Sequence, residues 1–172
     1  PIALLVILGY SYTKRFTALC HLILGLGLSL SPIGAYLAVT AQFDILPILF
    51  SCIVLFWVSG FDIIYALQDE NFDKQFNLHS IPVLLGQKNA LRFSRLMHFI
   101  AAAIILFIGI NYFATSTLFW TATTLFIGLL INQHRLVKPD DLSKINLAFF
   151  TNNGIASLIF GSLIVIELIT NN

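Results

Sequence analysis

Charged side chains are scarce in this sequence. Lys, Arg, Asp and Glu make up 10% of its 172 residues, while 58% of the residues are hydrophobic. Soluble domains usually have about 25% charged and about 45–50% apolar residues. A water-soluble protein of this size could not hide so much apolar surface, so lipid must surround much of the chain. The composition excludes an ordinary soluble domain, and we expect no nucleic-acid partner.

Cysteine is also rare. Cys20 and Cys52 are the only two, both lie in apolar runs, and neither has a C-x-x-C partner. This pattern argues against a disulfide framework and against a zinc site, and it favours simple packing for both thiols.

An initiator Met and a signal peptide are lacking as well. The sequence starts inside the apolar run Pro1–Leu8, which has neither a basic n-region nor a small-residue cleavage site. We therefore expect residue 1 to lie within a membrane helix of a longer protein. On this interpretation, residues 1–172 are the C-terminal part of a single transmembrane domain.

Long apolar runs dominate what is present. A helix needs about 20 apolar residues to cross the hydrocarbon core. Five runs approach this length, and none shows the alternation of a β-barrel strand. They are residues 19–39, 45–67, 96–112, 118–131 and 147–169. With the shortened first run, the sequence predicts an all-α polytopic bundle of about five complete spans and one truncated span.

The basic residues alternate between the connections. The first, third and fifth connections hold every Lys and Arg in the chain, and the second and fourth hold none. The positive-inside rule then places the three charged connections in the cytoplasm and the C-terminus outside. The basic residues are Lys14 and Arg15, then Lys74, Lys88, Arg92 and Arg95, and finally Arg135, Lys138 and Lys144.

A row of acidic residues begins inside the second full span. Asp62, Tyr65, Asp69 and Asp73 stand in the pattern D-x-x-Y-A-x-x-D-x-x-x-D. If the helix persists through Asp73, the three carboxylates lie within about 40° of one another on one face. Asp69 and Asp73 are about 6 Å apart along the axis, close enough to share a metal ion, whereas Asp62 lies about 10 Å deeper.

Carboxylates on one face repel, so a cation must offset them. Oxygen ligands at a membrane mouth suit Mg²⁺, which is usually held by one or two carboxylates plus substrate phosphates. A solvated acidic helix end would compete as an explanation of Asp69 and Asp73 alone, and it is the one we adopt for Glu70. Asp62 favours a functional site, because an ionisable group inside a span is a functional hypothesis by default. The sequence thus predicts Asp69 and Asp73 as ligands of Mg²⁺.

A second cluster, Tyr10, Lys14 and Arg15, is predicted on the same face of the membrane. Lys and Arg near a metal site could neutralise phosphate oxygens, Arg as a fork and Lys as a point charge. Taken alone, however, the cluster is better explained as an interfacial anchor.

Together these residues resemble the UbiA superfamily of intramembrane aromatic prenyltransferases. The acidic row resembles its second aspartate-rich motif, Ser80–Gly86 the short segment after that motif, and Tyr10-x-x-x-Lys14-Arg15 its Y-x-x-x-K-R element. The chain looks most similar to the 4-hydroxybenzoate polyprenyltransferases of ubiquinone synthesis. The implied fold is a nine-helix bundle, of which this chain would supply the end of the fourth helix through the ninth.

The resemblance implies Mg²⁺-dependent transfer of a polyprenyl group from a prenyl diphosphate to an aromatic acceptor, in a bacterial inner membrane. The family's first aspartate-rich motif, N-D-x-x-D-x-x-x-D, is absent from this sequence, so we expect the chain alone to be inactive. The implied catalytic residues are Asp62, Tyr65, Asp69 and Asp73, and the implied diphosphate-binding residues are Tyr10, Lys14 and Arg15.

Two other classes remain open. A transporter or channel with Asp62 on an ion pathway would explain that residue but not the repeat at Asp69 and Asp73. A purely structural membrane subunit would explain none of the carboxylates. His21 and His98 are expected to make interhelical or interfacial contacts, and Asn152 and Asn153 to hydrogen-bond across helices.

Overall fold

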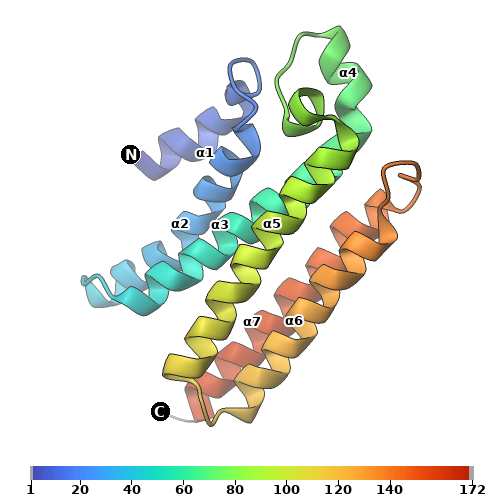
Figure 1. Cartoon of the computed structure of the whole chain (residues 1–172). Coiled ribbons are helices and arrows are strands. Elements are labelled where there is room, and N and C mark those ends of the chain that lie inside the picture. The colour runs from blue at the N-terminus through green and yellow to red at the C-terminus, as the bar shows by residue number, and fades with distance from the viewer. Residues whose placement is uncertain (1, 171–172) are drawn as a thin grey trace. The chain divides into compact units, whose positions relative to one another are not determined.

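The computed structural model describes residues 2–170, and the regular elements among them are helices, as the sequence predicts (Figure 1). The α-helices are α1 (Ile2–Thr13), α2 (Cys20–Thr40), α3 (Ile45–Tyr65), α4 (Glu70–Gln75), α5 (Ile81–Tyr112), α6 (Thr117–Leu136) and α7 (Asn152–Thr170). A 3₁₀ turn, Ala66–Asp69, joins α3 to α4, and a π-helical turn, Leu147–Thr151, precedes α7. Contacts divide the chain into a first unit that ends at Ala101 and a second that begins at Ala102.

Four helical segments among the described residues are long and apolar enough to cross a membrane. They are Cys20–Thr40, Ile45–Gln75, Ile81–Tyr112 and Leu147–Thr170. Helix α6 covers the fourth predicted run, residues 118–131, and has 20 residues, enough to cross the hydrocarbon core. Several threonines and the polar end Asn132–Arg135 lower its hydropathy. The short apolar helix α1 corresponds to the truncated first run.

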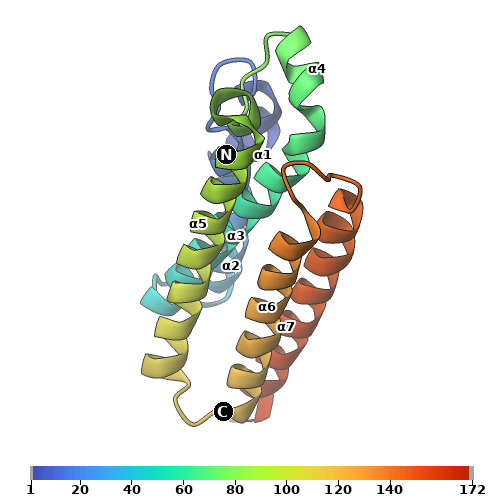
Figure 2. The same ribbon diagram turned by 45° about the vertical axis from the view of Figure 1, so that its right-hand side comes forward.

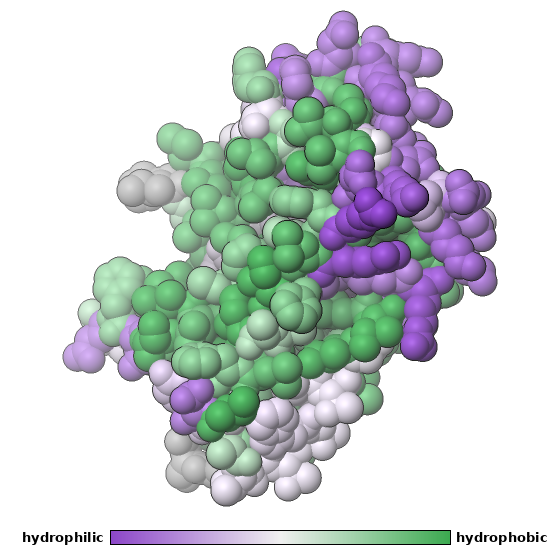
Figure 3. All heavy atoms as spheres, viewed as in Figure 1, coloured by the Kyte–Doolittle hydropathy of each residue, from purple (hydrophilic) through white to green (hydrophobic). Residues whose placement is uncertain are grey.

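Large apolar side chains lie on the surface of these helices. Val39 is 87% exposed, and Leu5 and Phe99 are more than 70% exposed. Figure 3 shows hydrophobic side chains over much of the helical surface, while hydrophilic ones gather around α4. Contiguous apolar surface of this extent is unfavourable in water and favourable in lipid, so the chain is an integral membrane protein.

The connection between α2 and α3 is short and fixed by local hydrogen bonds. Helix α2 ends at Ala41, whose left-handed backbone (φ 56°) lets its N–H donate to the carbonyl of Leu37. Helix α3 begins at Asp44, whose carboxylate accepts from the N–H of Leu46. These caps set α2 and α3 side by side as a hairpin, the most extensive helix pair of the first unit.

Gly25 allows close contact between α2 and α3. A Cβ atom at this position would lie 2.5 Å from the carbonyl oxygen of Leu55 and 2.4 Å from Oγ of Ser59. Both distances are shorter than van der Waals contact, so the backbones of the hairpin can approach this closely only with glycine at position 25.

Helix α5 packs on α3 through polar contacts as well as apolar ones. The hydroxyl of Ser94 donates to the carbonyl of Gly60 at 2.6 Å, and Nε2 of His98 lies 3.2 Å from the carbonyl oxygen of Trp57. His98 thus makes the interhelical contact expected for it. Since Gly60 has no side chain, the imidazole can lie directly against the backbone of α3.

The connections between the helices are shorter in the structure than the apolar runs predict. The segment from Gln68 to Arg95 was expected to connect two spans, but α5 begins at Ile81, with a bend at Gly86 (φ 73°). Similarly, α6 continues to Leu136, five residues beyond the end of the predicted run 118–131. Hydropathy finds only the apolar part of each helix, whereas Lys, Arg, Gln and Leu are good helix formers that extend it beyond the lipid.

In the second unit, α6 and α7 form a hairpin joined by amide side chains. Gln133 is fully buried and donates to the carbonyl of Ala148 in the π-helical turn, where carbonyls lose their regular partners. Asn132 donates to the side chain of Asn152 at 3.4 Å, so Asn152 bonds across helices as expected. The side-chain nitrogen of Asn153 is buried without a hydrogen bond among the described residues.

The close contact at Gly25 leads to a stability prediction. Replacing Gly25 with Ala should destabilise the protein by about 1–3 kcal/mol, because the added methyl group must displace the backbone of α3. Gly34 is a matched control on the same helix, since no described atom lies within 4 Å of a Cβ there. Thermal unfolding in detergent should show a lower Tm for G25A and an unchanged or higher Tm for G34A. Equal Tm values for the two variants would contradict the close approach.

Candidate functional site

A cavity of about 290 Å³ lies in the first unit, where the α1–α2 connection meets the junction of α3 and α4. The same end of the unit holds the start of α5, as Figures 1 and 2 show. The N–H of His79, just before α5, donates to the carbonyl of Lys14 at 2.7 Å. The cavity is lined by Tyr10, Ser11, Lys14, Cys20, His21, Leu24, Asp62, Tyr65, Ala66 and Asp69.

Lys14 connects this cavity to the acidic row. Its Nζ lies 2.8 Å from Oδ1 of Asp73, which is fully buried, while 28% of the lysine side chain is exposed. A buried carboxylate needs a partner, because an isolated charge is strongly disfavoured away from water. Lys14 therefore stabilises Asp73 from the side of the cavity, and the ion pair ties the α1–α2 connection to α4.

Asp69 also lines the cavity but lacks such a partner. It is half-buried, and among residues 2–170 its carboxylate has neither a hydrogen bond nor an ion pair. Its nearest acidic neighbour in sequence, Glu70, is instead held by Lys74 at 2.6 Å. Asp69 is thus the carboxylate of the row whose charge the described residues leave uncompensated.

Asp62 is held by a residue from another helix. Its Oδ2 lies 2.7 Å from Nδ1 of His21, near the start of α2. On the other side of the ring, Nε2 of His21 accepts from the N–H of Ile81 at 3.3 Å. His21 is thus hydrogen-bonded to both α3 and the first turn of α5, and it makes the interhelical contact expected for it.

The remaining predicted residues divide into two groups. Tyr10 and Tyr65 line the cavity together with Lys14. Arg15 does not: it is exposed, and its guanidinium lies 5.7 Å from the centre of the Tyr12 ring, in a cation–π contact. The structure therefore gathers six of the seven predicted residues at the cavity or against Lys14, and it leaves Arg15 outside the lining.

The acidic row does not lie on one regular helix. Helix α3 ends at Tyr65, and the next four residues form a tighter 3₁₀ turn, with three residues per turn instead of 3.6. Because of this change of pitch, Asp69 and Asp73 do not point in the directions that a continuous α-helix would give them relative to Asp62. Asp62 and Asp69 still line the same cavity, while Asp73 joins the site through Lys14.

His21 is the site residue that the sequence reasoning missed. The sequence predicts only an interhelical or interfacial contact for it, although it lies near the start of an apolar span and lines the cavity. The rule that marked Asp62, an ionisable group inside a span, applies equally to His21 and would have identified it.

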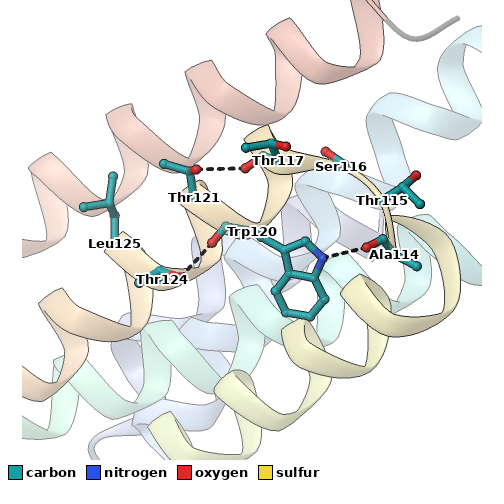
Figure 4. Close-up of a pocket in the computed structure, with 8 residues that line it drawn as sticks. All are labelled: Ala114, Thr115, Ser116, Thr117, Trp120, Thr121, Thr124 and Leu125. Carbon is teal, nitrogen blue, oxygen red and sulfur yellow. Dashed lines mark hydrogen bonds between the residues drawn. The ribbon is translucent and has the colours of Figure 1, made fainter.

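A second hollow, of about 580 Å³, lies at the start of α6 in the second unit (Figure 4). Three of its polar side chains already donate hydrogen bonds: Thr121 to the carbonyl of Thr117, Thr124 to that of Trp120, and the indole of Trp120 to that of Ala114. It has no titratable side chain among its lining residues. The lining of the hollow thus offers no acid or base that could activate one of its hydroxyl groups.

The residues of the first cavity partly fit the predicted magnesium ion. The unpaired carboxylate of Asp69 suits a hard cation, and Mg²⁺ commonly takes only one or two carboxylates from the protein. The charge of Asp73, in contrast, is already balanced by Lys14. No group of three or more His, Cys, Asp or Glu side chains among residues 2–170 could hold a metal ion. The uncompensated carboxylate of Asp69 thus fits a metal ion better than the paired carboxylate of Asp73 does.

Comparisons with known proteins show what the chain is similar to. The model of the UbiA prenyltransferase family matches residues 1–154. A 4-hydroxybenzoate octaprenyltransferase of Francisella tularensis subsp. novicida is 28% identical over 92% of this chain and 55% of its own length. The protein of the same name from Nitrosomonas europaea is 29% identical over 95% of this chain and 55% of its own length. The chain thus spans about half the length of the curated relatives that it matches.

A solved structure has the same fold. The apo structure of a UbiA homolog from Aeropyrum pernix K1 aligns with a TM-score of 0.84 at 30% identity. The alignment covers 98% of this chain and 62% of that protein.

The ion pair between Lys14 and Asp73 can be tested by a double-mutant cycle. Replacing Lys14 with Met should destabilise the protein strongly, toward the lower end of roughly 3–5 kcal/mol because Lys14 is partly exposed. The reason is that Asp73 would remain buried without a partner. In a D73N background the same Lys14→Met change should cost much less. Additive shifts of Tm in detergent would contradict the pair.

Proposed function

This chain belongs to the UbiA prenyltransferase family, and on that premise we propose that its protein transfers a polyprenyl group from a prenyl diphosphate to an aromatic acceptor, 4-hydroxybenzoate. The observation that carries the proposal is that one cavity is lined by Lys14, by the uncompensated carboxylate of Asp69 and by the hydrogen-bonded pair of Asp62 and His21. The names of the curated relatives support the choice of acceptor.

The mouth of the cavity suits a diphosphate. The ammonium group of Lys14 can contact phosphate oxygens, and the hydroxyl of Tyr10, in the last turns of α1, can donate to them. Arg15 adds positive charge on the exposed side of this connection. Members of the family generally depend on a metal ion. We propose Mg²⁺, held by Asp69 with the diphosphate and with Asp73 as the second predicted ligand; when bound, it would neutralise negative charge on the diphosphate.

The reaction breaks the bond between the allylic carbon and the diphosphate oxygen, and both electrons leave with the diphosphate. Lys14 stabilises the negative charge that develops there, the role that preorganised charge performs best. A ring carbon of the acceptor then bonds to the allylic carbon, and the same ring carbon loses its proton to a base in the cavity, for which the carboxylate of Asp62 is available. Asp62 and Tyr65, which line the cavity beside His21, are placed to orient the acceptor or stabilise the cation.

The orientation in the membrane is also a proposal. We place the charged connections in the cytoplasm and the C-terminus outside, in a bacterial inner membrane, because the basic residues occur in alternate connections. In the first unit, the first and third connections of the chain meet, as the contact of His79 with Lys14 supports. We further propose that the 172-residue chain does not catalyse transfer by itself, since it supplies only one of the two aspartate-rich motifs.

The proposed role of Asp69 predicts a loss of activity. Replacing Asp69 with Asn keeps its shape but removes the charge that would hold the metal ion. In membranes that contain the protein carrying this chain, transfer of a labelled prenyl group to 4-hydroxybenzoate should fall by about 10²–10³-fold. Asp140, an exposed loop carboxylate, is the matched control, and D140N should transfer at the wild-type rate. Wild-type turnover by D69N would refute the proposed metal ligand.

The transport alternative predicts a different result. A transporter that uses Asp62 would move an ion across liposome membranes without any prenyl diphosphate. Ion flux that depends on Asp62, together with no Mg²⁺-dependent prenyl transfer by the wild type, would show that the protein is a transporter and would contradict the proposed function.

A further inference from the structure

We propose that His21 is a positioning residue: it holds the carboxylate of Asp62 so that the second oxygen faces the aromatic acceptor. This inference rests on the proposed function and adds a residue to its site. Its basis is the set of contacts that connects α2, α3 and α5 around one imidazole ring.

The first step is the state of the ring. A backbone N–H can only donate a hydrogen bond, so Nε2 of His21, which receives the N–H of Ile81, carries a lone pair. The ring proton of this tautomer is on Nδ1, and it points to Oδ2 of Asp62 at 2.7 Å. Each nitrogen of His21 therefore has one defined partner, which fixes the orientation of the ring.

The second step concerns the carboxylate. With Oδ2 bonded to His21, Oδ1 of Asp62 has no hydrogen bond among the described residues. The side chain of Asp62 is 22% exposed, whereas that of His21 is 3% exposed. Asp62 is therefore the member of the pair that faces the cavity, and His21 supports it from the buried side.

The third step separates positioning from direct catalysis. To accept the proton that leaves the acceptor ring, His21 would have to break its bond with Ile81. Asp62 has a free oxygen in the cavity and needs no such rearrangement. His21 therefore acts through Asp62, because it prevents the carboxylate from rotating away from the acceptor.

His21 also accepts a hydrogen bond from the N–H of Ile81, one of the first-turn N–H groups of α5 that have no partner within the helix. A useful experiment must separate this capping role from the positioning of Asp62. The two roles use different nitrogens, so suitable substitutions can remove one and leave the other. Asn places an amide N–H near the position of Nδ1 and has no acceptor at the position of Nε2.

The experiment measures kcat and KM for both substrates in membranes that contain the protein carrying this chain. His21→Leu should lower kcat by about 10–100-fold, with the KM for prenyl diphosphate unchanged, because a misplaced reacting group has costs of this size. His21→Asn should restore kcat to within about threefold of the wild type, since it again donates to Asp62. If H21L does not fold, as judged by gel filtration and Tm, His21→Met replaces it.

Two controls identify the cause of any loss. In a D62N background, H21L should have no further effect on kcat, because a positioning residue has nothing left to position. Ser80→Ala removes the side-chain acceptor for the N–H of Val83, in the same first turn of α5, and leaves the His21–Asp62 contact intact. S80A should keep the kcat of the wild type.

Each other outcome overturns the inference. A wild-type kcat in H21L, an equal loss in H21N and H21L, a further loss in the D62N background, or a matching loss in S80A would show that His21 only packs or caps. Prenyl transfer by the wild type would leave the proposed function standing in all four cases. No transfer by the wild type to any aromatic acceptor would overturn the proposed function itself, and this inference with it.

Discussion

The ion pair between Lys14 and Asp73 determines the shape of the site. A carboxylate with no exposure to solvent needs a cation close by, and the cation that meets this need comes from the connection between α1 and α2. The pair therefore brings a segment some sixty residues away against α4. Where the two segments meet, Lys14 and Asp69 line the same cavity. The same contact between segments lets the N–H of His79 donate to the carbonyl of Lys14.

The cavity also depends on how closely the helices approach one another. Gly25 lets α2 lie against the backbone of α3, and this hairpin brings His21 near Asp62. From the other side, Ser94 and His98 hold α5 against Gly60 and Trp57, and the start of α5 then supplies the N–H of Ile81 to His21. Apolar burial contributes little between helices in lipid, so small residues and polar contacts largely determine this arrangement.

Much of this fold follows from the sequence, because hydropathy identifies membrane helices directly. The acidic row and the basic cluster at Lys14 were also visible, since charges stand out in an apolar chain. The 3₁₀ turn after Tyr65 was not predictable, because a tighter turn has no distinct composition. The partner of Asp62 was missed for another reason: His21 is 41 residues away, and only the packing of α2 on α3 brings them together. Arg15 was placed by charge alone, which cannot indicate where a long side chain points.

The three aspartates of the row differ in how their charges are satisfied. Asp62 is hydrogen-bonded to His21 and Asp73 is paired with Lys14. Lys14 lies in the connection between α1 and α2, and His21 lies in the first turn of α2. Asp69, between them, has no partner among residues 2–170, although it lines the same cavity. A carboxylate beside two other acids is least stable where nothing balances it. An external cation would therefore lower the electrostatic energy most by binding at Asp69. Asp62 lines the same cavity, whereas Asp73 acts on it only through its ion pair with Lys14.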